Sequence, residues 1–126
     1  LKPLPANAFH LWTLADMDRI LTYISHHPIR KAVVIGGGFV GLEVVEQLVH
    51  RGIDVSILER NPQVLKPLDR LMARMIEEHM QSKGVGVYLS RQIDRVRSSP
   101  SDAINSQAKI TGLELDNDLT LDCDLL

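Results

Sequence analysis

The sequence predicts an α/β fold in which helices flank a parallel sheet and an antiparallel β-meander follows near the C-terminus. Two short apolar runs rich in β-branched residues, 31–35 and 53–58, are typical of strands buried on both faces. A helical apolar pattern lies between them, as a parallel crossover requires. After residue 90 the apolar residues recur mainly at every second position, which indicates antiparallel strands with one buried face.

Composition indicates one soluble globular domain. The chain has 126 residues, of which 44% are hydrophobic and 24% charged, with a net charge of -2 and one cysteine. A single thiol excludes an internal disulfide framework, and the near-neutral charge gives no basic field for nucleic acid. No apolar run approaches the roughly 20 residues that span a bilayer, and the first residues lack the order of a signal peptide. We therefore expect no nucleic-acid partner, no membrane partner and a reducing, cytoplasmic setting.

The N-terminal part should form an extended segment and then a helix. Residues 1–12 contain Pro3 and Pro5 and show no periodicity, so they read as an extended lead-in. Thr13 or Asp16 can cap a helix that ends before Pro28. The apolar residues of this helix recur at three- and four-residue steps, and we expect the stripe to be buried: Leu14, Met17, Ile20, Leu21 and Ile24.

A strand, a glycine turn, a helix and a second strand make up the next segment. The first strand, 31–35, leads directly into three glycines, and the helix runs from Phe39 to Arg51. Gly52 is placed to end this helix in a left-handed conformation before the strand 53–58. The helix residues expected on the inner side are Val40, Val44 and Leu48, with Val45 as a further candidate. The whole is one right-handed βαβ unit.

A second helix and the meander should complete the domain. A loop over 61–67 precedes an amphipathic helix whose methionines we interpret as core filler, and a third strand covers 85–89. The apolar stripe of that helix is Leu68, Leu71, Met72, Met75, Ile76 and Met80. The inward residues of the meander are Ile93, Val96, Leu113, Leu115, Leu119, Leu121, Cys123 and Leu125. A polar, mobile hairpin loop is expected between Arg97 and Ala108, and a tight turn at 116–118. The strand pattern is still running at Leu126, so we expect a piece of a longer protein.

The glycine turn carries the strongest functional signal. Gly36, Gly38 and Gly41 form G-x-G-x-x-G, which is weak evidence alone. Here it follows a buried strand, opens a helix, and is followed at the end of the next strand by Glu59, 23 positions after Gly36. The acid that binds a dinucleotide ribose is expected about 20 positions on. The pattern predicts a Rossmann-type dinucleotide site; the alternative is a turn that only packs helix against sheet.

Each residue of this turn has a physical task. Gly36 permits the tight turn, Gly38 leaves room for a pyrophosphate, and Gly41 lets the helix sit close to the strand. Exposed N–H groups at the helix start favour the phosphate charges, so the candidate cofactor-binding residues of the turn are Gly36, Gly37, Gly38, Phe39, Val40 and Gly41.

The residues at the end of the second strand predict which nucleotide binds. Glu59 can accept hydrogen bonds from both ribose hydroxyls, and its charge disfavours a 2′-phosphate, which favours NAD(H) over NADP(H). Arg60 could turn toward a phosphate instead, or simply face solvent.

The segment Ala32–Glu43 closely resembles the nucleotide domain of FAD-dependent pyridine nucleotide-disulfide oxidoreductases, above all the branch with coenzyme A-disulfide reductases and NADH oxidases. Residues 13–19 resemble that family's linker helix, 58–60 its strand-end acid, and 113–126 its meander and last strand. The resemblance implies that residues 1–30 are a lead-in segment and linker helix, and that 31–126 form the NAD(H)-binding domain of a larger flavoprotein.

The resemblance also implies a function. The parent enzyme would pass hydride from NADH to FAD, which then reduces a disulfide, a sulfenate or dioxygen. FAD would bind in a part of the parent absent here, so this chain would hold no catalytic residue and be inactive alone; a homodimeric parent is one option. Glu43 would contact the nicotinamide carboxamide; the alternative is a first-turn carboxylate stabilised by the helix dipole.

Other readings of the sequence remain. A methyltransferase-like fold also has a glycine-rich turn followed by an acid, although it would not normally need Gly41, and a non-catalytic nucleotide-sensing domain would share the whole pattern. Cys123 lies in phase with Leu121 and Leu125, so we interpret it as a small buried hydrophobe, not a redox thiol. The five histidines and the C-terminal aspartates show no metal-ligand spacing.

Overall fold

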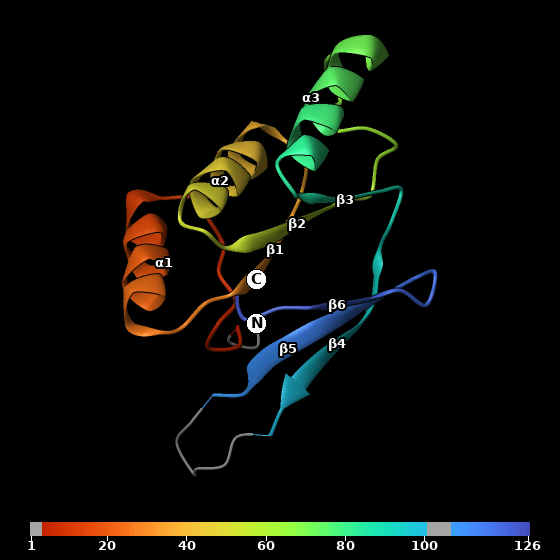
Figure 1. Cartoon of the computed structure of the whole chain (residues 1–126). Helices are drawn as coiled ribbons and strands as arrows, with labels where there is room; N and C mark the ends of the chain where they lie inside the picture. The colour runs from red at the N-terminus through yellow and green to blue at the C-terminus, as the bar shows by residue number, and fades with distance from the viewer. Residues whose placement is uncertain (1–3, 101–106) are drawn as a thin grey trace.

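The computed structural model describes residues 4–100 and 107–126 and shows helices on one side of a parallel sheet with a meander below it (Figure 1). Over these residues the elements in chain order are α1 (Leu14–His26), β1 (Lys31–Ile35), α2 (Phe39–His50), β2 (Asp54–Glu59), α3 (Arg70–Ser82), β3 (Gly86–Leu89), β4 (Ile93–Ser99), β5 (Lys109–Leu115) and β6 (Thr120–Asp122). The predicted α/β class with an antiparallel meander is confirmed.

The parallel sheet has the order β1-β2-β3, and its strands end together. Ile35 pairs with Leu58, and Leu58 pairs with Tyr88, so the carboxyl ends of the three strands lie at one edge. On the other side of β1, Leu125 forms a parallel bridge with Ala32, and the N–H of Val33 donates to the carbonyl of Leu125 at 2.9 Å. The chain thus leaves β1 in one direction through β2 and β3 and returns to its opposite side at the C-terminus.

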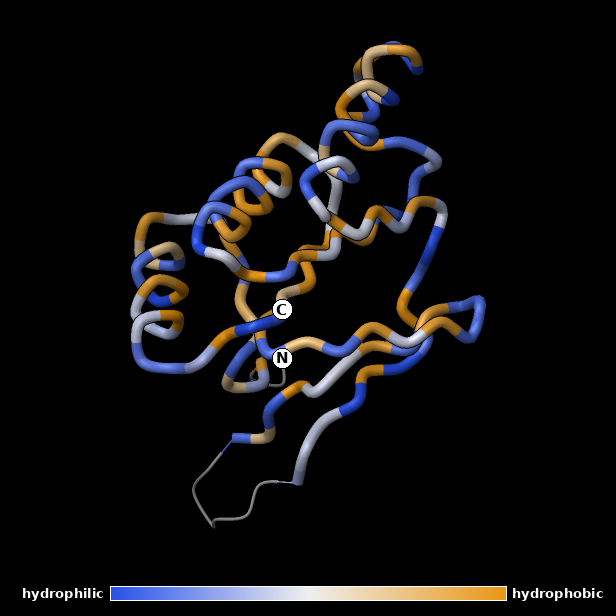
Figure 2. The backbone as a smooth tube through the Cα atoms, in the orientation of Figure 1, coloured by the Kyte–Doolittle hydropathy of each residue, from blue (hydrophilic) through white to orange (hydrophobic). Residues whose placement is uncertain are grey.

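The sheet is buried on both faces because successive strand residues point in opposite directions. Ala32 packs into a cluster with Val45 and Leu48 of α2, whereas Val33 packs into a second cluster with Leu113 of the meander. In Figure 2 much of the tube along β1 and β2 has the colour of hydrophobic residues. The strands therefore have no polar face, as their runs of Val, Ile and Leu predict.

Helix α1 begins and ends as predicted, but its apolar stripe is not buried. Thr13 is the N-cap and forms a reciprocal capping box with Asp16. Leu14 is 81% exposed, and Met17 and Leu21 are also exposed, so the expectation of a buried stripe was wrong for these residues. Helix α1 contacts the N-terminal segment through Tyr23, whose ring centroid lies 5.3 Å from that of Phe9.

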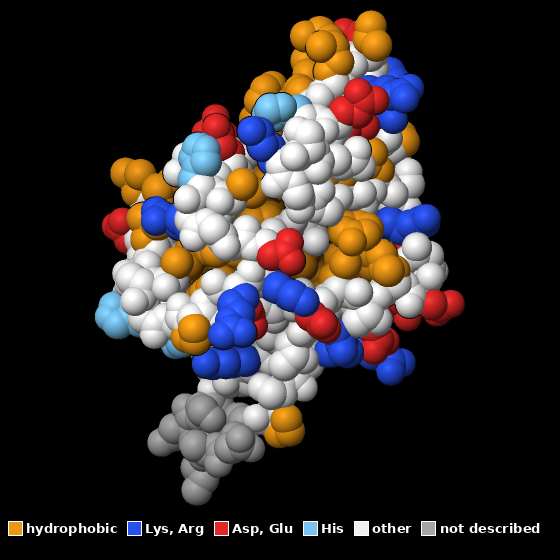
Figure 3. Space-filling view, viewed as in Figure 1, with side chains coloured by type: hydrophobic (Ala, Val, Ile, Leu, Met, Phe, Trp, Pro, Cys, Tyr) orange, Lys and Arg blue, Asp and Glu red, His pale blue; other side chains and the backbone are white. Residues whose placement is uncertain are grey.

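Helices α2 and α3 also expose residues that their patterns assigned to the core. Val40 is exposed, while Val45 and Leu48 are buried. Met80 is buried, but Met72 and Met75 are exposed, so the interpretation as core filler holds for Met80 alone among these three. Figure 3 shows hydrophobic side chains at the surface at the outer end of α3. Apolar periodicity identifies a helix face but does not say whether another element covers it.

The meander pairs β4 with β5 and β5 with β6, both antiparallel. Asp118 has φ +62° in the predicted turn at 116–118, and the N–H of Leu115 donates to the carbonyl of Leu119 at 2.8 Å. Strand β4 runs to Ser99, so the polar loop begins later than predicted; its central residues, 101–106, lie outside the described residues. Val96 and Leu119 are exposed, contrary to the alternation read from the sequence.

The N-terminal segment is tied into the core by Asn7. Its side chain is 2% exposed and both donates to and accepts from the backbone of Ile110, each at 2.7 Å. The Asn7 amide also donates to the carbonyl of Asp124 at 2.9 Å. This one side chain joins β5 to the C-terminal segment. Among the described residues, none of the helices is long and apolar enough to cross a membrane.

Candidate dinucleotide-binding site

The turn after β1 requires glycine at two positions. Gly36 has φ +105°, a backbone conformation that side-chain-bearing residues rarely adopt, and its N–H donates to the carbonyl of Leu58 at 2.8 Å. A Cβ atom on Gly41 would overlap the carbonyl oxygen of Gly36, so α2 can approach the turn only because Gly41 has no side chain.

Gly38 differs from both. It is the N-cap of α2 with φ -81°, and a Cβ atom built on it meets nothing within 4 Å. The space in front of Gly38 is therefore open. The first N–H groups of a helix have no partner within the helix, so those at the start of α2 are available to an acceptor in this space.

Glu59 ends β2 and is tied to the glycine turn. Its side chain is 8% exposed. Oε2 accepts from the N–H of Gly37 at 2.6 Å, and Oε1 accepts from the backbone N–H of Asn61 at 2.7 Å and from its side-chain amide at 2.8 Å. A carboxylate has about four acceptor positions, and three of them are used here. Among the described residues, one acceptor position of Glu59 is left without a donor, whereas the sequence led us to expect that Glu59 accepts from two ribose hydroxyls.

These contacts keep Glu59 ionised at neutral pH. Burial is the largest single influence and by itself would raise the pKa of the carboxyl group. The three hydrogen bonds from Asn61 and Gly37, together with the positive charge of Arg60, act in the opposite direction and hold the pKa of Glu59 below its usual value of 4.5.

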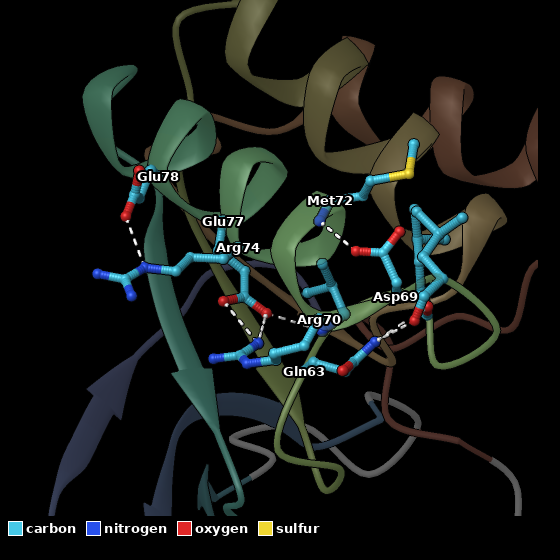
Figure 4. A network of polar contacts seen from close by, with 10 residues as sticks. Gln63, Asp69, Arg70, Met72, Arg74, Glu77 and Glu78 are labelled. Carbon is cyan, nitrogen blue, oxygen red and sulfur yellow. Dashed lines mark hydrogen bonds and ion pairs between the residues drawn. The ribbon is translucent and has the colours of Figure 1, made fainter.

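The loop between β2 and α3 is hydrogen-bonded to the glycine turn. The N–H of Leu65 donates to the carbonyl of Gly37 at 2.7 Å. The neighbouring Val64 is fully buried, and its N–H donates to Glu77 of α3 at 3.1 Å. Arg70 donates to the same carboxylate at 3.0 and 3.1 Å (Figure 4). Helix α3 therefore supports the glycine turn through the loop: Glu77 binds Val64, and the next residue, Leu65, binds Gly37. The sequence did not predict these contacts.

Two hollows meet at the glycine turn. One, of about 580 Å³, lies at β1 and the start of α2 and is lined by Gly36, Gly38, Gly41 and the C-terminal Leu125. The other, of about 510 Å³, lies beyond Glu59 and is lined by Gly36, Arg60, Asn61 and by residues 91–93 that follow β3. Both volumes are in the range of small-molecule sites. The structure thus gathers seven of the nine predicted site residues around one edge of the sheet: Gly36, Gly37, Gly38, Val40, Gly41, Glu59 and Arg60.

The two remaining candidates, Phe39 and Glu43, lie in another region. Phe39, Val40 and Glu43 line a groove between α1 and α2, and of these only Val40 also lines the larger hollow. Glu43 is exposed and is the fifth residue of α2, so it lies in the second turn of the helix. The alternative reading of Glu43 as a first-turn carboxylate is therefore wrong, and the helix dipole acts on it less strongly.

The sequence also missed Asn61 and Arg91. Asn61 supplies two of the three hydrogen bonds to Glu59, and Arg91 enters the smaller hollow from the turn after β3. An asparagine two positions after a strand-end acid is a local signal that could have been used. Nothing near Arg91 in the sequence indicates that it lies beside Glu59.

Comparison with known proteins gives consistent matches. The sequence model of the family described as pyridine nucleotide-disulphide oxidoreductase matches residues 31–111. A coenzyme A disulfide reductase of Staphylococcus haemolyticus is 35% identical over 89 residues, which cover 71% of this chain and 20% of that protein. An NADH oxidase of Methanocaldococcus jannaschii is 36% identical over 89 residues, covering 70% and 20%. The chain spans about a fifth of the length of these relatives.

Solved structures share the fold over nearly the whole chain. Reduced CoADR-RHD of Bacillus anthracis superposes with a TM-score of 0.82 and 32% identity, covering 100% of this chain and 22% of that one. A NAD-dependent persulfide reductase from A. fulgidus gives a TM-score of 0.82 and 28% identity, covering 96% and 21%.

Proposed function

The chain belongs to the pyridine nucleotide-disulphide oxidoreductase family, and from this membership we propose that it is the NAD(H)-binding domain of a flavoprotein that passes hydride from NADH to FAD. In this proposal residues 31–126 form the domain, and residues 1–30 are the lead-in segment and linker helix. The observation that carries it is the hydrogen bond from Gly37 to Glu59, which joins the glycine turn to an ionised strand-end acid between two hollows.

Topology supports the position of the dinucleotide. In open α/β sheets ligands bind outside the carboxyl ends of the strands, where the strand order reverses. Here the order reverses at β1, between β2 on one side and the Leu125 segment on the other. The pyrophosphate would lie over Gly38, with the nicotinamide half toward the larger hollow and the adenosine half toward the smaller one.

The residues of the site suit this ligand. Gly38 leaves open space at the start of α2, where backbone N–H groups can donate to the pyrophosphate. Glu59 retains one acceptor position for a ribose hydroxyl. Glu43 would accept from the nicotinamide carboxamide, which requires that part of the ligand to pass Val40, one of the residues that line both the hollow and the groove. The bound nicotinamide supplies the hydride; this chain supplies position and nucleotide choice.

Further parts of the proposal concern the parent protein. The parent protein would contain the FAD domain and bind FAD, and it would pass electrons to a disulfide, a sulfenate or dioxygen. That the parent is a homodimer and that it is cytoplasmic stay predictions. The names of the relatives support NADH as the donor, since one is an NADH oxidase. The methyltransferase alternative has no support, because the chain belongs to another family.

Calorimetric titration of the 126-residue chain with NADH tests the proposal. We expect one site per chain, and no measurable binding to Gly38→Val, because its side chain fills the space in front of α2. Gly38→Ala, with a smaller side chain, should weaken binding less. Failure of the unchanged chain to bind NADH, or equal binding by Gly38→Val, would contradict the proposal.

A further inference from the structure

The turn after β3 is fixed to the end of β2 and to the residues that follow it. Ser90 adopts φ +53°, and its N–H donates to the carbonyl of Asn61 at 3.0 Å. The N–H of Arg91 donates to the carbonyl of Glu59 at 3.2 Å. Two backbone hydrogen bonds and an unusual conformation thus set Arg91 beside the strand-end acid. A non-glycine residue with positive φ is strained, and such strain is often found next to functional sites.

Arg91 carries a cation that has no partner among the described residues. It lines the smaller hollow and is half-buried. Within residues 4–100 and 107–126, its guanidinium group makes no hydrogen bond and no ion pair with another side chain. By contrast Arg97, which is equally half-buried, donates to Asp122 at 2.6 Å. A half-buried guanidinium that faces a hollow is available to whatever fills the hollow.

Part of the hollow is apolar, although Asn61 and Gln92 also line it. Ile35, Leu58 and Ile93 line it together with Glu59 and Arg60. A flat base could lie against these side chains, and an arginine side chain is well suited to cover its other face, because a guanidinium group is planar and stacks on aromatic rings.

We propose that Arg91 is an adenine-positioning residue, whose guanidinium group stacks on the base of the bound dinucleotide in the hollow that Arg91 lines together with Ile35 and Ile93. The inference rests on the proposed function, since it requires a dinucleotide at Glu59. It assigns the ribose to Glu59 and the base to Arg91.

Arg60 and Arg91 then have different tasks. Arg60 follows Glu59 directly, and it is the cation whose charge helps to lower the pKa of that carboxyl group. A 2′-phosphate on the ribose would therefore meet Arg60 and Glu59. Arg91 lines the hollow from the turn after β3, and the base lies farther from the pyrophosphate than the ribose does.

The test compares Arg91→Ala with Arg95→Ala in the 126-residue chain, each titrated with NADH and with NADPH. Arg95 is exposed on β4, contacts Glu114 at 3.8 Å and does not line the hollow, so its removal takes away the same charge without the contact. We expect Arg91→Ala to weaken binding of both dinucleotides by the same factor of roughly ten, the scale of one base-stacking contact. Arg95→Ala should leave both unchanged.

Each other result has a definite meaning. If NADPH loses much more affinity than NADH in Arg91→Ala, the arginine contacts a 2′-phosphate and the base assignment is wrong. If Arg91→Ala binds both as the unchanged chain does, Arg91 has no role and the proposed function stands. If the unchanged chain binds neither, the proposed function and this inference fall together. Thermal melting of both variants checks that the fold is intact.

Discussion

The backbone N–H of Gly37 donates to the Glu59 carboxylate at 2.6 Å, which links the turn after β1 to the last residue of β2. The same carboxylate also accepts two hydrogen bonds from Asn61. These contacts hold the Glu59 side chain in place before any ligand binds. Glu59 is thus a fixed negative charge and not a mobile side chain. A fixed charge discriminates more sharply against a second negative charge, since it cannot move away.

We predict that the chain binds NADH more tightly than NADPH by roughly tenfold or more, which corresponds to about 1.4 kcal/mol. Glu59→Ala should narrow the gap, because the charge that repels a 2′-phosphate is gone. Glu46→Ala, which removes an exposed carboxylate of α2, is the matched control. Calorimetric titrations of the three proteins with NADH and with NADPH measure this difference in affinity. Equal affinities of the unchanged chain for both dinucleotides would show that Glu59 does not select between them.

The two glycines at the start of α2 should respond differently to the same substitution. Gly41→Val should lower the free energy of unfolding by about 1–3 kcal/mol or more, because its Cβ overlaps the carbonyl of Gly36. Gly38→Val should leave stability nearly unchanged, since its Cβ meets only open space. Urea denaturation of both variants measures this, and equal losses would show that the two positions have been confused.

Stability in acid should depend on Asp16. Its pKa is lowered from 3.8 to about 2, first by a hydrogen bond from the backbone of Trp12 and then by one with the Thr13 side chain, against the effect of burial. A depressed folded-state pKa contributes stability that is present above pH 3.8 and lost as the pH falls toward 2. We expect the melting temperature of Asp16→Asn to fall less between pH 5 and pH 2.5 than that of the unchanged chain. Parallel curves for the two proteins would contradict the assignment.

Local patterns were enough to predict the order of helices and strands. The glycine turn, the strand-end acid and the hairpin at 116–118 all depend on residues close in sequence, and all were predicted in place. Most of the errors concern which helix residues are covered by other elements, beside the exposed Val96 and Leu119 of the meander. The apolar stripes of α1 and α3 were assigned to the core, yet Leu14 and Met75 are exposed, because burial depends on neighbouring elements that a periodicity does not report.

The candidate site divides in the same way. Gly36, Gly38 and Glu59 follow from one motif and its spacing. Arg91 could not be predicted, since it reaches Glu59 only through the turn after β3. The same holds outside the site for Asn7, which bonds to a residue 103 positions away. The number of ribose contacts was also out of reach. It depends on which acceptor positions of Glu59 the Asn61 backbone and amide already occupy.

Cys123 should be a slow thiol. Its side chain is 3% exposed, and burial, with smaller effects from Asp124 and Asp122, raises its pKa from 9.0 to about 11. Because the thiolate is the reactive form, at pH 8 the folded chain should hold roughly a hundredfold less of it than an unfolded chain does. Reaction with a chromogenic disulfide, followed with and without denaturant, measures the ratio. A folded-state rate equal to the unfolded one would mean that the thiol is open to solvent.

The last prediction is that the purified chain is colourless and does not oxidise NADH, whatever disulfide is supplied and also in the presence of oxygen. The sequence holds one G-x-G-x-x-G turn, which accounts for one dinucleotide. If Glu43 serves the nicotinamide, neither it nor the buried Cys123 is left to hold a flavin ring or attack a disulfide. The chain also spans about a fifth of its relatives, so most of their residues have no counterpart in it.

Two measurements test this prediction. The first is a visible absorbance spectrum after addition of FAD and desalting, in which we expect no retained flavin band. The second is the rate of NADH oxidation with each acceptor, for the unchanged chain and for Cys123→Ser, in which we expect the uncatalysed rate throughout. Flavin retained near one equivalent would mean that the chain holds a second cofactor site. Acceptor-dependent turnover that disappears in Cys123→Ser would make this cysteine a redox residue, and the chain would then be more than the nicotinamide half of a two-cofactor enzyme.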